Sequence, residues 1–534
     1  MASDRISKLS RRKLLGFFGA GAVATTAVGV AAIQAGQGGE AAPVGGLVSD
    51  PGAGAPVRAQ PQARVPQVRT IENPKRSATI ATENSLAGTS DWRLSRSGHR
   101  KSDDLRHQVQ GFASSTVVRA GGSIDFFVTV NPVQSFRVKV FRLGWYNGEG
   151  ARLLLTSGPI RGVTQPGHKV DADPDSRAVY CEWAKSWTLK VPSDWVSGTY
   201  LALLTNDQGF QHYISFVVSD DRKADFLCVL PFATYQAYNL YPQNGVDGQS
   251  VYFGYGPDKK LDPRRRSTQV SFARPFAGSG ATKLVDYEHN FIKWAEQHAY
   301  DVTYTSNLAL NPDLDLRKYR AIVIPGHDEY WSQSMRDAVD RAKAQGVHIV
   351  SFGANQCYWR VRLTPSPAKD LRLSVYKTKP DPAARTQREA AKLWRDVGAP
   401  EQMLWGSCYG QAGAGVPREG LPLVVKNAEH WLWAGSGVTE DEHLTGAVMG
   451  EADHQVTGLA LPKATEMTVL SDSTFTNTGG LHDRQQTVLY RSPAGGYVFN
   501  AGTFGWGVFL GREGDAAHKI QRATGNLFRK LLEV

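Results

Sequence analysis

Cysteine is scarce in this chain. Its 534 residues include only four, Cys181, Cys228, Cys357 and Cys408. They are far apart and none forms a CxxC pair, which excludes a thiolate zinc knuckle and a dense disulfide scaffold. Four cysteines still allow one disulfide bridge, and the sequence does not indicate which pair would form it.

Long apolar runs are also rare. The one candidate, residues 16–35, is rich in Gly and Ala, lacks acidic residues and follows Ser10-Arg11-Arg12-Lys13-Leu14-Leu15. A basic segment before an apolar one predicts an export signal, and the paired arginines favour the twin-arginine route. We expect a signal peptide over residues 1–35 and a secreted or cell-envelope protein. The alternative is an uncleaved membrane tether, because the segment is long enough to span a bilayer.

Acidic residues are few at the N-terminus. The chain has a net charge of +11, and residues 1–70 hold eight Lys or Arg against three Asp or Glu. No long basic run occurs beyond Arg264-Arg265-Arg266 and no nucleic-acid-binding motif is present, so we expect no nucleic-acid partner. Residues 36–90 are rich in Gly, Pro, Ala and Gln without periodicity, which predicts a disordered linker.

Residues 91–220 have the pattern of an all-β domain. About seven short runs of β-branched and aromatic residues are separated by turn signals, and the run over 136–142 alternates between apolar and basic side chains. This number and spacing of strands predict an immunoglobulin-like sandwich. Together with the length of the chain, the pattern indicates more than one domain.

Residues 221–534 have the pattern of an α/β domain. Residues 321–325 and 347–352 are apolar runs, and residues 332–345 between them have helical periodicity. Such a strand, helix, strand unit forms parallel strands, and further strands near residues 225 and 301 extend the sheet. In such sheets ligands bind beyond the carboxyl ends of the strands.

Three segments follow these strands, at residues 234–239, 327–330 and 353–357, and they supply tyrosines, a carboxylate, a histidine, an asparagine and a thiol. In a first hypothesis Glu329 and two tyrosines hold a trivalent metal, since carboxylate and phenolate oxygens suit ferric iron better than zinc or copper. The alternative is that the tyrosines of this region, Tyr235, Tyr238, Tyr252 and Tyr330, are amphipathic core residues. In a second hypothesis Cys357 is a nucleophile and His327 its base, although the glycine spacing of a nucleophile elbow is missing. The alternative for Cys357 is a buried structural thiol.

Five motifs together resemble a known family. They are Pro231-Phe-Ala-Thr-Tyr-Gln-Ala-Tyr-Asn239, Gly248-Gln-Ser-Val-Tyr252, Gly326-His-Asp-Glu-Tyr-Trp-Ser332, Phe352-Gly-Ala-Asn-Gln-Cys-Tyr-Trp359 and Ala501-Gly-Thr-Phe-Gly-Trp506. In this order they look like the C-terminal domain of the N,N-dimethylformamidase large (beta) subunit family. The sandwich segment, with Val140-Phe-Arg-Leu-Gly-Trp-Tyr146, looks like the domain that precedes it in many relatives.

The resemblance implies a glutamine-amidotransferase-like (flavodoxin-like) α/β domain over residues 221–534 with a mononuclear Fe(III) site. The glutamate ligand maps onto Glu329, and the tyrosine ligands map onto Tyr238 and Tyr252. His327 and Asn355 fall beside the metal ligands, and Glu451, in Met449-Gly-Glu-Ala-Asp453, matches a further catalytic carboxylate.

The implied activity is hydrolysis of the C–N bond of a small amide. Fe(III) would polarise the carbonyl or a bound water, Glu451 or His327 would handle the proton, and Asn355 would orient water or stabilise the oxyanion. Two features depart from the family: no small-subunit sequence lies in this chain, and the N-terminus carries an export signal. The alternatives to the iron hydrolase are a catalytically silent cell-surface or polymer-binding protein on the same fold and the cysteine hydrolase. A homo-oligomer is compatible with the sequence.

Overall fold

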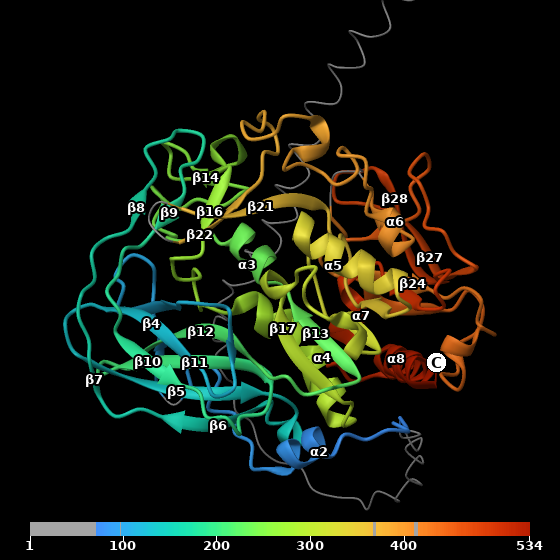
Figure 1. Cartoon of the computed structure of the whole chain (residues 1–534), viewed down its shortest axis with the longest axis horizontal. Helices are drawn as coiled ribbons and strands as arrows, with labels where there is room; N and C mark the ends of the chain where they lie inside the picture. Colours follow the sequence, from blue (N-terminus) through green and yellow to red (C-terminus); the bar gives the residue numbers. More distant parts are fainter. Residues whose placement is uncertain (1–70, 97, 367–369, 411–414, 534) are drawn as a thin grey trace, which may run out of the picture.

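The computed structural model describes residues 71–96, 98–366, 370–410 and 415–533. The predicted signal peptide and the predicted linker up to residue 70 lie outside this part of the chain. The protein is a mixed α/β protein with one large mixed sheet and several small antiparallel ones. Two sheets of the N-terminal part lie beside the larger α/β part (Figure 1).

The large sheet has seven strands in the order β17-β13-β18-β20-β29-β28-β27. The first five are parallel to one another, and β28 pairs antiparallel with both β29 and β27. The strands are β13 (Phe226–Leu230), β17 (Val302–Ser306), β18 (Ala321–Ile324), β20 (His348–Ser351), β27 (Glu466–Thr476), β28 (His482–Arg491) and β29 (Tyr497–Asn500). The parallel strand, helix, strand unit predicted over residues 321–352 is present.

Alternating side chains of these strands enter two different cores. In β18, Ala321 and Val323 join one core, whereas Ile322 and Ile324 join the other. Helices α4 (His289–Gln297), α7 (Phe504–Phe509) and α8 (Asp515–Glu533) cover the first face, and α3 (Phe232–Tyr238) and α5 (Gln333–Ala344) cover the second. A sheet buried on both faces needs apolar residues at every position, which explains the continuous apolar runs in the sequence.

The N-terminal sheets enclose a third core. One sheet contains β1 (Arg100–Lys101), β3 (Val117–Arg119), β5 (Ser135–Leu143), β6 (Ala151–Thr156), β7 (Ile160–Arg161), β11 (Gly198–Asn206) and β12 (Phe210–Ser219), and the other contains β2 (Val109–Ala113), β4 (Ser123–Val130) and β10 (Trp187–Lys190). Phe136, Val138 and Val140 of β5 point into this core, in agreement with the predicted alternation.

Smaller elements complete the chain. The remaining strands are β8 (Lys169–Val170), β9 (Val179–Tyr180), β14 (Gly254–Tyr255), β15 (Leu261–Asp262), β16 (Gln269–Ser271), β19 (Tyr330–Ser332), β21 (Trp359–Pro365), β22 (Leu371–Ser374), β23 (Cys408–Tyr409), β24 (Leu421–Val424), β25 (His443–Val448) and β26 (Asp453–His454); α6 covers Gln402–Trp405. Residues 387–389 form a 3-10 turn (Gln387–Glu389). Within the described residues, no helix has the length and hydropathy needed to cross a membrane.

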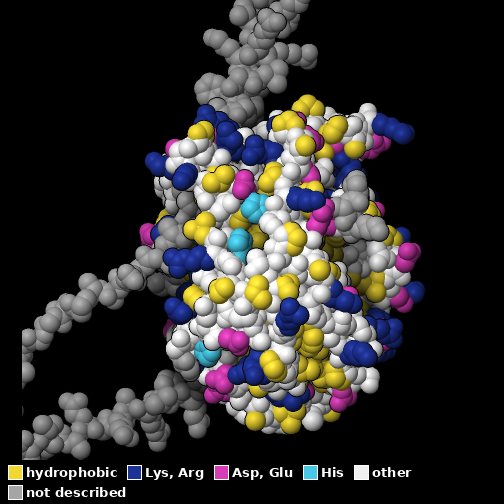
Figure 2. Space-filling view, turned by 90° about the vertical axis from the view of Figure 1, so that its left-hand side faces the viewer, with side chains coloured by type: hydrophobic (Ala, Val, Ile, Leu, Met, Phe, Trp, Pro, Cys, Tyr) yellow, Lys and Arg dark blue, Asp and Glu magenta, His cyan; other side chains and the backbone are white. Residues whose placement is uncertain are grey.

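The end of the predicted linker is ordered in the structure. Residues 78–85 form helix α2 (Ala78–Ser85), whose Glu83 and Asn84 are buried. Asn84 donates to Glu296 of α4 at 2.7 Å, and Glu83 accepts from Tyr146 at 2.7 Å. Composition alone did not indicate these contacts, because they depend on partners more than 60 residues away. On the face shown in Figure 2, basic, acidic and apolar side chains are interspersed.

Candidate functional site

Polar side chains gather where the central parallel strands end. Helix α3 follows β13, residues 327–329 follow β18, and the turn with Asn355 follows β20. Most of the segment 234–239 lies in α3, which presents Tyr238 from its last turn. Tyr252 comes from the irregular segment before β14.

Tyr238, Tyr252 and Glu329 meet at one point. The Tyr238 hydroxyl lies 2.6 Å from Glu329 Oε2, and the Tyr252 hydroxyl lies 2.6 Å from both carboxylate oxygens. The two hydroxyls are 2.9 Å apart, and the rings stack with centroids 4.4 Å apart. Glu329 is 1% exposed and Tyr252 3%. Three oxygen-donor side chains, separated by up to 91 residues in sequence, therefore share one small volume.

The four oxygens of this cluster have too few protons for their contacts. Tyr252 has three acceptor oxygens within 2.9 Å, but a phenol carries one hydrogen. The two phenols carry two hydrogens for the four close oxygen pairs of the cluster, so at least two of the four pairs have no hydrogen of their own. Ligands bound about 2.0 Å from one ion at right angles are themselves about 2.8 Å apart, so the spacing matches oxygens on one side of a metal ion. The donor set fits a hard cation such as Fe(III).

The surroundings shift the pKa of the two phenols and the pKa of Glu329 in opposite directions. Burial and the Glu329 carboxylate raise the pKa of Tyr238 and Tyr252 well above the usual value of a phenol. Burial also raises the pKa of Glu329, but hydrogen bonding to His327 and the charges of His327 and Lys377 outweigh it and lower the pKa overall. The carboxylate is thus ionised beside two neutral phenols. A bound cation would lower the pKa of the phenols and give tyrosinate.

His327 and Glu451 lie beside the cluster. His327 Nδ1 is 3.0 Å from the Ala354 carbonyl, to which it donates, and Nε2 is 3.3 Å from both Glu329 Oε2 and the Tyr238 hydroxyl. Glu451 Oε2 lies 3.8 Å from His327 Nδ1. Burial and the Glu329 charge raise the pKa of Glu451 to about 7, although His327 lowers it. A carboxyl group with a pKa near neutrality can both take up and release a proton.

Asn355 is held by an aspartate that the sequence analysis did not select. Its backbone has φ +55°, a left-handed conformation that costs energy for a residue with a side chain. The Asn355 amide donates to Asp453 Oδ1 at 2.8 Å, and Asn500 donates to the other Asp453 oxygen at 2.9 Å. Asp453 lies two residues after Glu451, so its hydrogen bond to the Asn355 amide holds Asn355 near Glu451. Asn355 Oδ1 and Glu451 Oε2 have no hydrogen-bond partner within the described chain.

Three polar residues fix the segment that carries Glu329. Thr234 Oγ1 accepts from the Glu329 amide at 2.9 Å and donates to Asp328 at 3.1 Å. Asn307 also donates to Asp328, at 2.8 Å, and Gln356 accepts from the Asp328 amide at 2.8 Å. Glu329 is therefore presented by a backbone whose neighbours come from three other segments.

Two lysines lie over the faces of the clustered rings. Lys377 Nζ is 3.3 Å from the centre of the Tyr252 ring and donates to the Tyr330 hydroxyl at 2.7 Å. Lys283 Nζ is 4.0 Å from the centre of the Tyr238 ring. Burial lowers the pKa of both ammonium groups, and the Glu329 carboxylate opposes this. Neither lysine could be selected from the sequence, because no motif marks either of them.

Cys357 does not face this cluster. It is fully buried, and Arg336 donates to its sulfur at 3.6 Å. Burial raises its pKa well above that of a free thiol. This environment suits a structural thiol better than a nucleophile. All four cysteines are free and buried.

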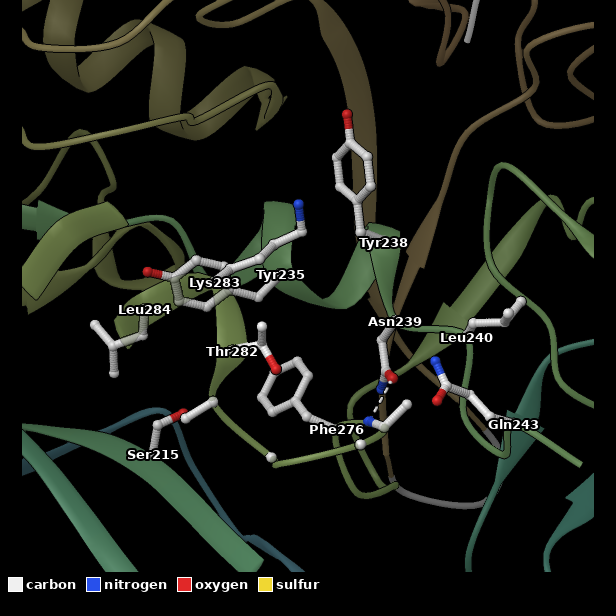
Figure 3. A pocket seen from close by; sticks show the side chains of 14 residues that line it. Ser215, Tyr235, Tyr238, Asn239, Leu240, Gln243, Phe276, Thr282, Lys283 and Leu284 are labelled. Carbon is white, nitrogen blue, oxygen red and sulfur yellow. Dashed lines mark hydrogen bonds between the residues drawn. The ribbon is translucent and has the colours of Figure 1, made fainter. Parts of the chain in front are cut away.

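A pocket of about 240 Å³ opens beside Tyr238 and Lys283. Phe276, Leu240 and Leu284 provide apolar walls (Figure 3). The Tyr238 hydroxyl and the Lys283 ammonium point away from the other labelled side chains of the pocket. The Tyr238 ring therefore forms the wall of the pocket next to the oxygens that meet at Glu329. A pocket of this size holds a small organic molecule.

The structure thus brings all six predicted site residues into one region: Tyr238, Tyr252, Glu329, His327, Asn355 and Glu451. Their proximity does not test metal binding or catalysis. In the described part of the chain, no group of three or more His, Cys, Asp or Glu side chains is arranged to hold a metal. A metal at the cluster would depend on the phenols.

Comparison with known proteins identifies the family that the sequence motifs resemble. The family described as "N,N-dimethylformamidase beta subunit-like, C-terminal" matches residues 137–519. The N,N-dimethylformamidase beta subunit of Paracoccus aminophilus is 21% identical over 394 residues, which cover 61% of this chain and 51% of the relative. The corresponding subunit of Alcaligenes sp is 21% identical over 421 residues, which cover 66% of this chain and 55% of the relative. The chain spans about half the length of these relatives.

Among solved structures, a chimeric titin Z1Z2-Z1Z2 tandem aligns with 22% of this chain and 52% of its own, at 19% identity and a TM-score of 0.12. A likeness at that score does not define the fold of either part.

Proposed function

The chain belongs to the N,N-dimethylformamidase beta subunit-like family, and from this premise we propose that it is an exported, iron-dependent hydrolase of the C–N bond of a small amide. Tyr238, Tyr252 and Glu329 would hold one Fe(III) ion. We propose further that the α/β part has a glutamine-amidotransferase-like fold and that the N-terminal sheets form an immunoglobulin-like sandwich.

One observation carries this proposal: the oxygens of two phenols and a carboxylate are 2.6 to 2.9 Å apart with too few protons between them. An ordinary core would separate such groups, because close oxygens with no hydrogen between them repel one another. A cation compensates the crowding directly. When bound, Fe(III) would supply Lewis-acid activation of a carbonyl or of water.

The remaining residues of the site fit the proton transfers of amide hydrolysis. In this reaction water oxygen adds to the carbonyl carbon, the C–N bond breaks, and a proton reaches the departing nitrogen. Glu451, with a pKa of about 7, can accept the proton of water and return it to the nitrogen. Asn355, whose side-chain oxygen lacks a partner, can orient that water. His327 remains a second candidate for the proton.

Elemental analysis and an optical spectrum of protein purified without added metal test the proposal. We expect close to one equivalent of iron and a visible tyrosinate-to-iron charge-transfer band. Tyr238→Phe and Tyr252→Phe should each weaken the band, whereas Tyr319→Phe, at a buried tyrosine outside the cluster, should not. A colourless, metal-free protein that cleaves no formamide would contradict the proposal and favour a binding protein.

A further inference from the structure

A cavity of about 740 Å³ lies between the N-terminal sheets and the α/β part. Its walls come from β2, from residues 180–183 and from β12 on one side. On the other side they come from α3 and from residues 272–276. Cavities of this volume at an interface between two parts of a chain are frequent binding sites for small molecules.

Flat apolar surfaces line this interdomain cavity. Phe112 and Phe127 stack with centroids 5.1 Å apart and 16° between their planes, and Trp183 lies 5.4 Å from Phe112. The Trp183 indole N–H already donates to the Pro166 carbonyl at 2.8 Å. The indole therefore offers the cavity an apolar ring and no free donor. Phe272 adds a further ring from the opposite wall.

The charged residues of the cavity already have partners. Asp370 accepts from Arg372 at 2.5 Å. Arg274 donates to three backbone carbonyls at 2.8, 3.0 and 3.4 Å. Glu182 pairs with Lys169 at 2.5 Å. Arg274 has no carboxylate partner, but four of its five N–H groups already donate, so an anion would lose its hydration for little in return and these walls favour a neutral ligand.

The interdomain cavity adjoins the pocket beside Tyr238. Ser215 and Phe276 line both. Figure 3 shows these two side chains on the side of the pocket opposite the Tyr238 hydroxyl. The two spaces therefore share the wall formed by Ser215 and Phe276, and a molecule that reaches from one to the other would pass Phe276. The N-terminal sheets would then contribute directly to ligand binding.

We propose that the interdomain cavity binds a neutral aromatic group. This assignment rests on the proposed function in one respect: the group is carried by the amide that is hydrolysed beside Glu329. The substrates would then be neutral amides with an aromatic substituent, in preference to the smallest formamides. Phe276, between the two spaces, would contact the linkage between the ring and the amide.

The binding claim can be tested without catalysis. Benzyl alcohol, a neutral aromatic without an amide, is the probe, and its binding to the full chain is measured by saturation-transfer NMR. Ala273→Phe fills the cavity from a half-buried position whose backbone hydrogen bonds are kept. Ala120→Phe, at a half-buried alanine packed on the core of the N-terminal sheets, is the matched control.

We expect benzyl alcohol to bind the natural protein and the Ala120→Phe variant, and to bind Ala273→Phe at least about tenfold more weakly. Benzoate should bind the natural protein more weakly than benzyl alcohol does. This second comparison needs no variant and remains decisive if Ala273→Phe fails to fold. Equal binding by Ala273→Phe, or equal or tighter binding of benzoate, would overturn the assignment.

Measurements of amide hydrolysis provide the second test. The ratio of kcat/KM for N-benzylformamide to that for N,N-dimethylformamide should fall about tenfold in Ala273→Phe and stay unchanged in Ala120→Phe. An unchanged ratio in Ala273→Phe overturns the link to the substrate. If benzyl alcohol binds as expected but neither amide is cleaved by the iron-loaded protein, the proposed function fails while the cavity assignment stands.

Discussion

Two buried polar clusters of this protein differ in how completely their atoms are paired. The interface cluster, at the contact between the N-terminal sheets and the α/β part, centres on Arg142 and Glu296. Arg142 donates to both Glu296 oxygens, at 2.7 and 2.8 Å, and these oxygens also accept from Tyr304 and Asn84. Every charged atom in this pair has a partner.

In the site cluster of Tyr238, Tyr252 and Glu329, Tyr252 and Glu329 are buried and Tyr238 is half-buried, and two phenol hydrogens serve four close oxygen pairs. Its oxygens crowd together, and Asn355 and Glu451 beside it have unpartnered oxygens. A complete network stabilises a fold, whereas an incomplete one costs stability unless a ligand completes it. We therefore assign the first cluster to structure and propose that the second binds a ligand.

Breaking the interface cluster should have the largest effect on stability. Arg142→Met leaves Glu296 buried without its counter-charge and should lower the free energy of unfolding by about 3 to 5 kcal/mol. Urea unfolding followed by tryptophan fluorescence measures this. Arg264→Met, which removes an exposed arginine from a pair with Asp262, should leave the free energy of unfolding nearly unchanged. A change as small as this in Arg142→Met would show that the pair is dispensable.

Breaking the site cluster should instead abolish function and spare the fold. Glu329→Gln should remove the iron and the visible band and lower amide hydrolysis roughly a thousandfold, about 4 kcal/mol in the barrier. The free energy of unfolding of the metal-free protein should stay equal or rise, because the crowding is relieved. Glu288→Gln is the control, since burial raises the pKa of Glu288 to about 8 and it is already largely neutral at pH 7. Retention of iron by Glu329→Gln would remove Glu329 from the ligand set.

Acid should weaken the interface through two neutral histidines. His212 lies near the Phe276 carbonyl and His289 near the Gly150 carbonyl, so each links the two parts. Burial lowers the pKa of both rings from 6.5 to about 4, and the charges of Lys101 near His212 and of Lys293 near His289 act in the same direction. Their contribution is complete above pH 6.5 and is lost as the pH falls towards 4.

Each of these histidines should then cost up to about 3 kcal/mol at pH 4, which urea unfolding between pH 7 and 4 measures. His289→Gln should reduce the pH slope by nearly one proton, and His443→Gln, at an exposed position, should leave it unchanged. Equal slopes for the natural protein and His289→Gln would contradict the assignment of a neutral ring to His289.

A smaller effect on activity is expected from a change at Asp453, which supports Asn355. Asp453→Asn weakens the hold on the Asn355 amide and should lower kcat about 10- to 100-fold with little change in KM. Iron content and the visible band should be retained, since Asp453 does not contact the proposed ligands. Asp472→Asn, at an aspartate paired with Arg484, should leave kcat unchanged. Loss of iron from Asp453→Asn would mean that Asp453 supports the ligand set itself.

The local sequence pattern was sufficient to predict much of this structure. The apolar runs at 321–325 and 347–352 and the helical period between them correspond to β18, β20 and α5, because burial on both faces leaves a clear signature. Glu329 could be selected because it directly follows one of these strands. Helix α2 and the lysines over the phenols had no such signature, since their roles depend on partners distant in sequence.

By itself the sequence determined the family, the α/β pattern and the residues that follow the strands, because strand periodicity and short motifs are local properties. Only the tertiary structure decided that Tyr238 and Tyr252, 91 and 77 residues from Glu329, place their oxygens within 2.6 Å of its carboxylate. It also decided that Lys377 covers Tyr252 and that Asp453 supports Asn355. Such distances follow from how the strands and their connections pack, and that packing is set by the whole chain at once.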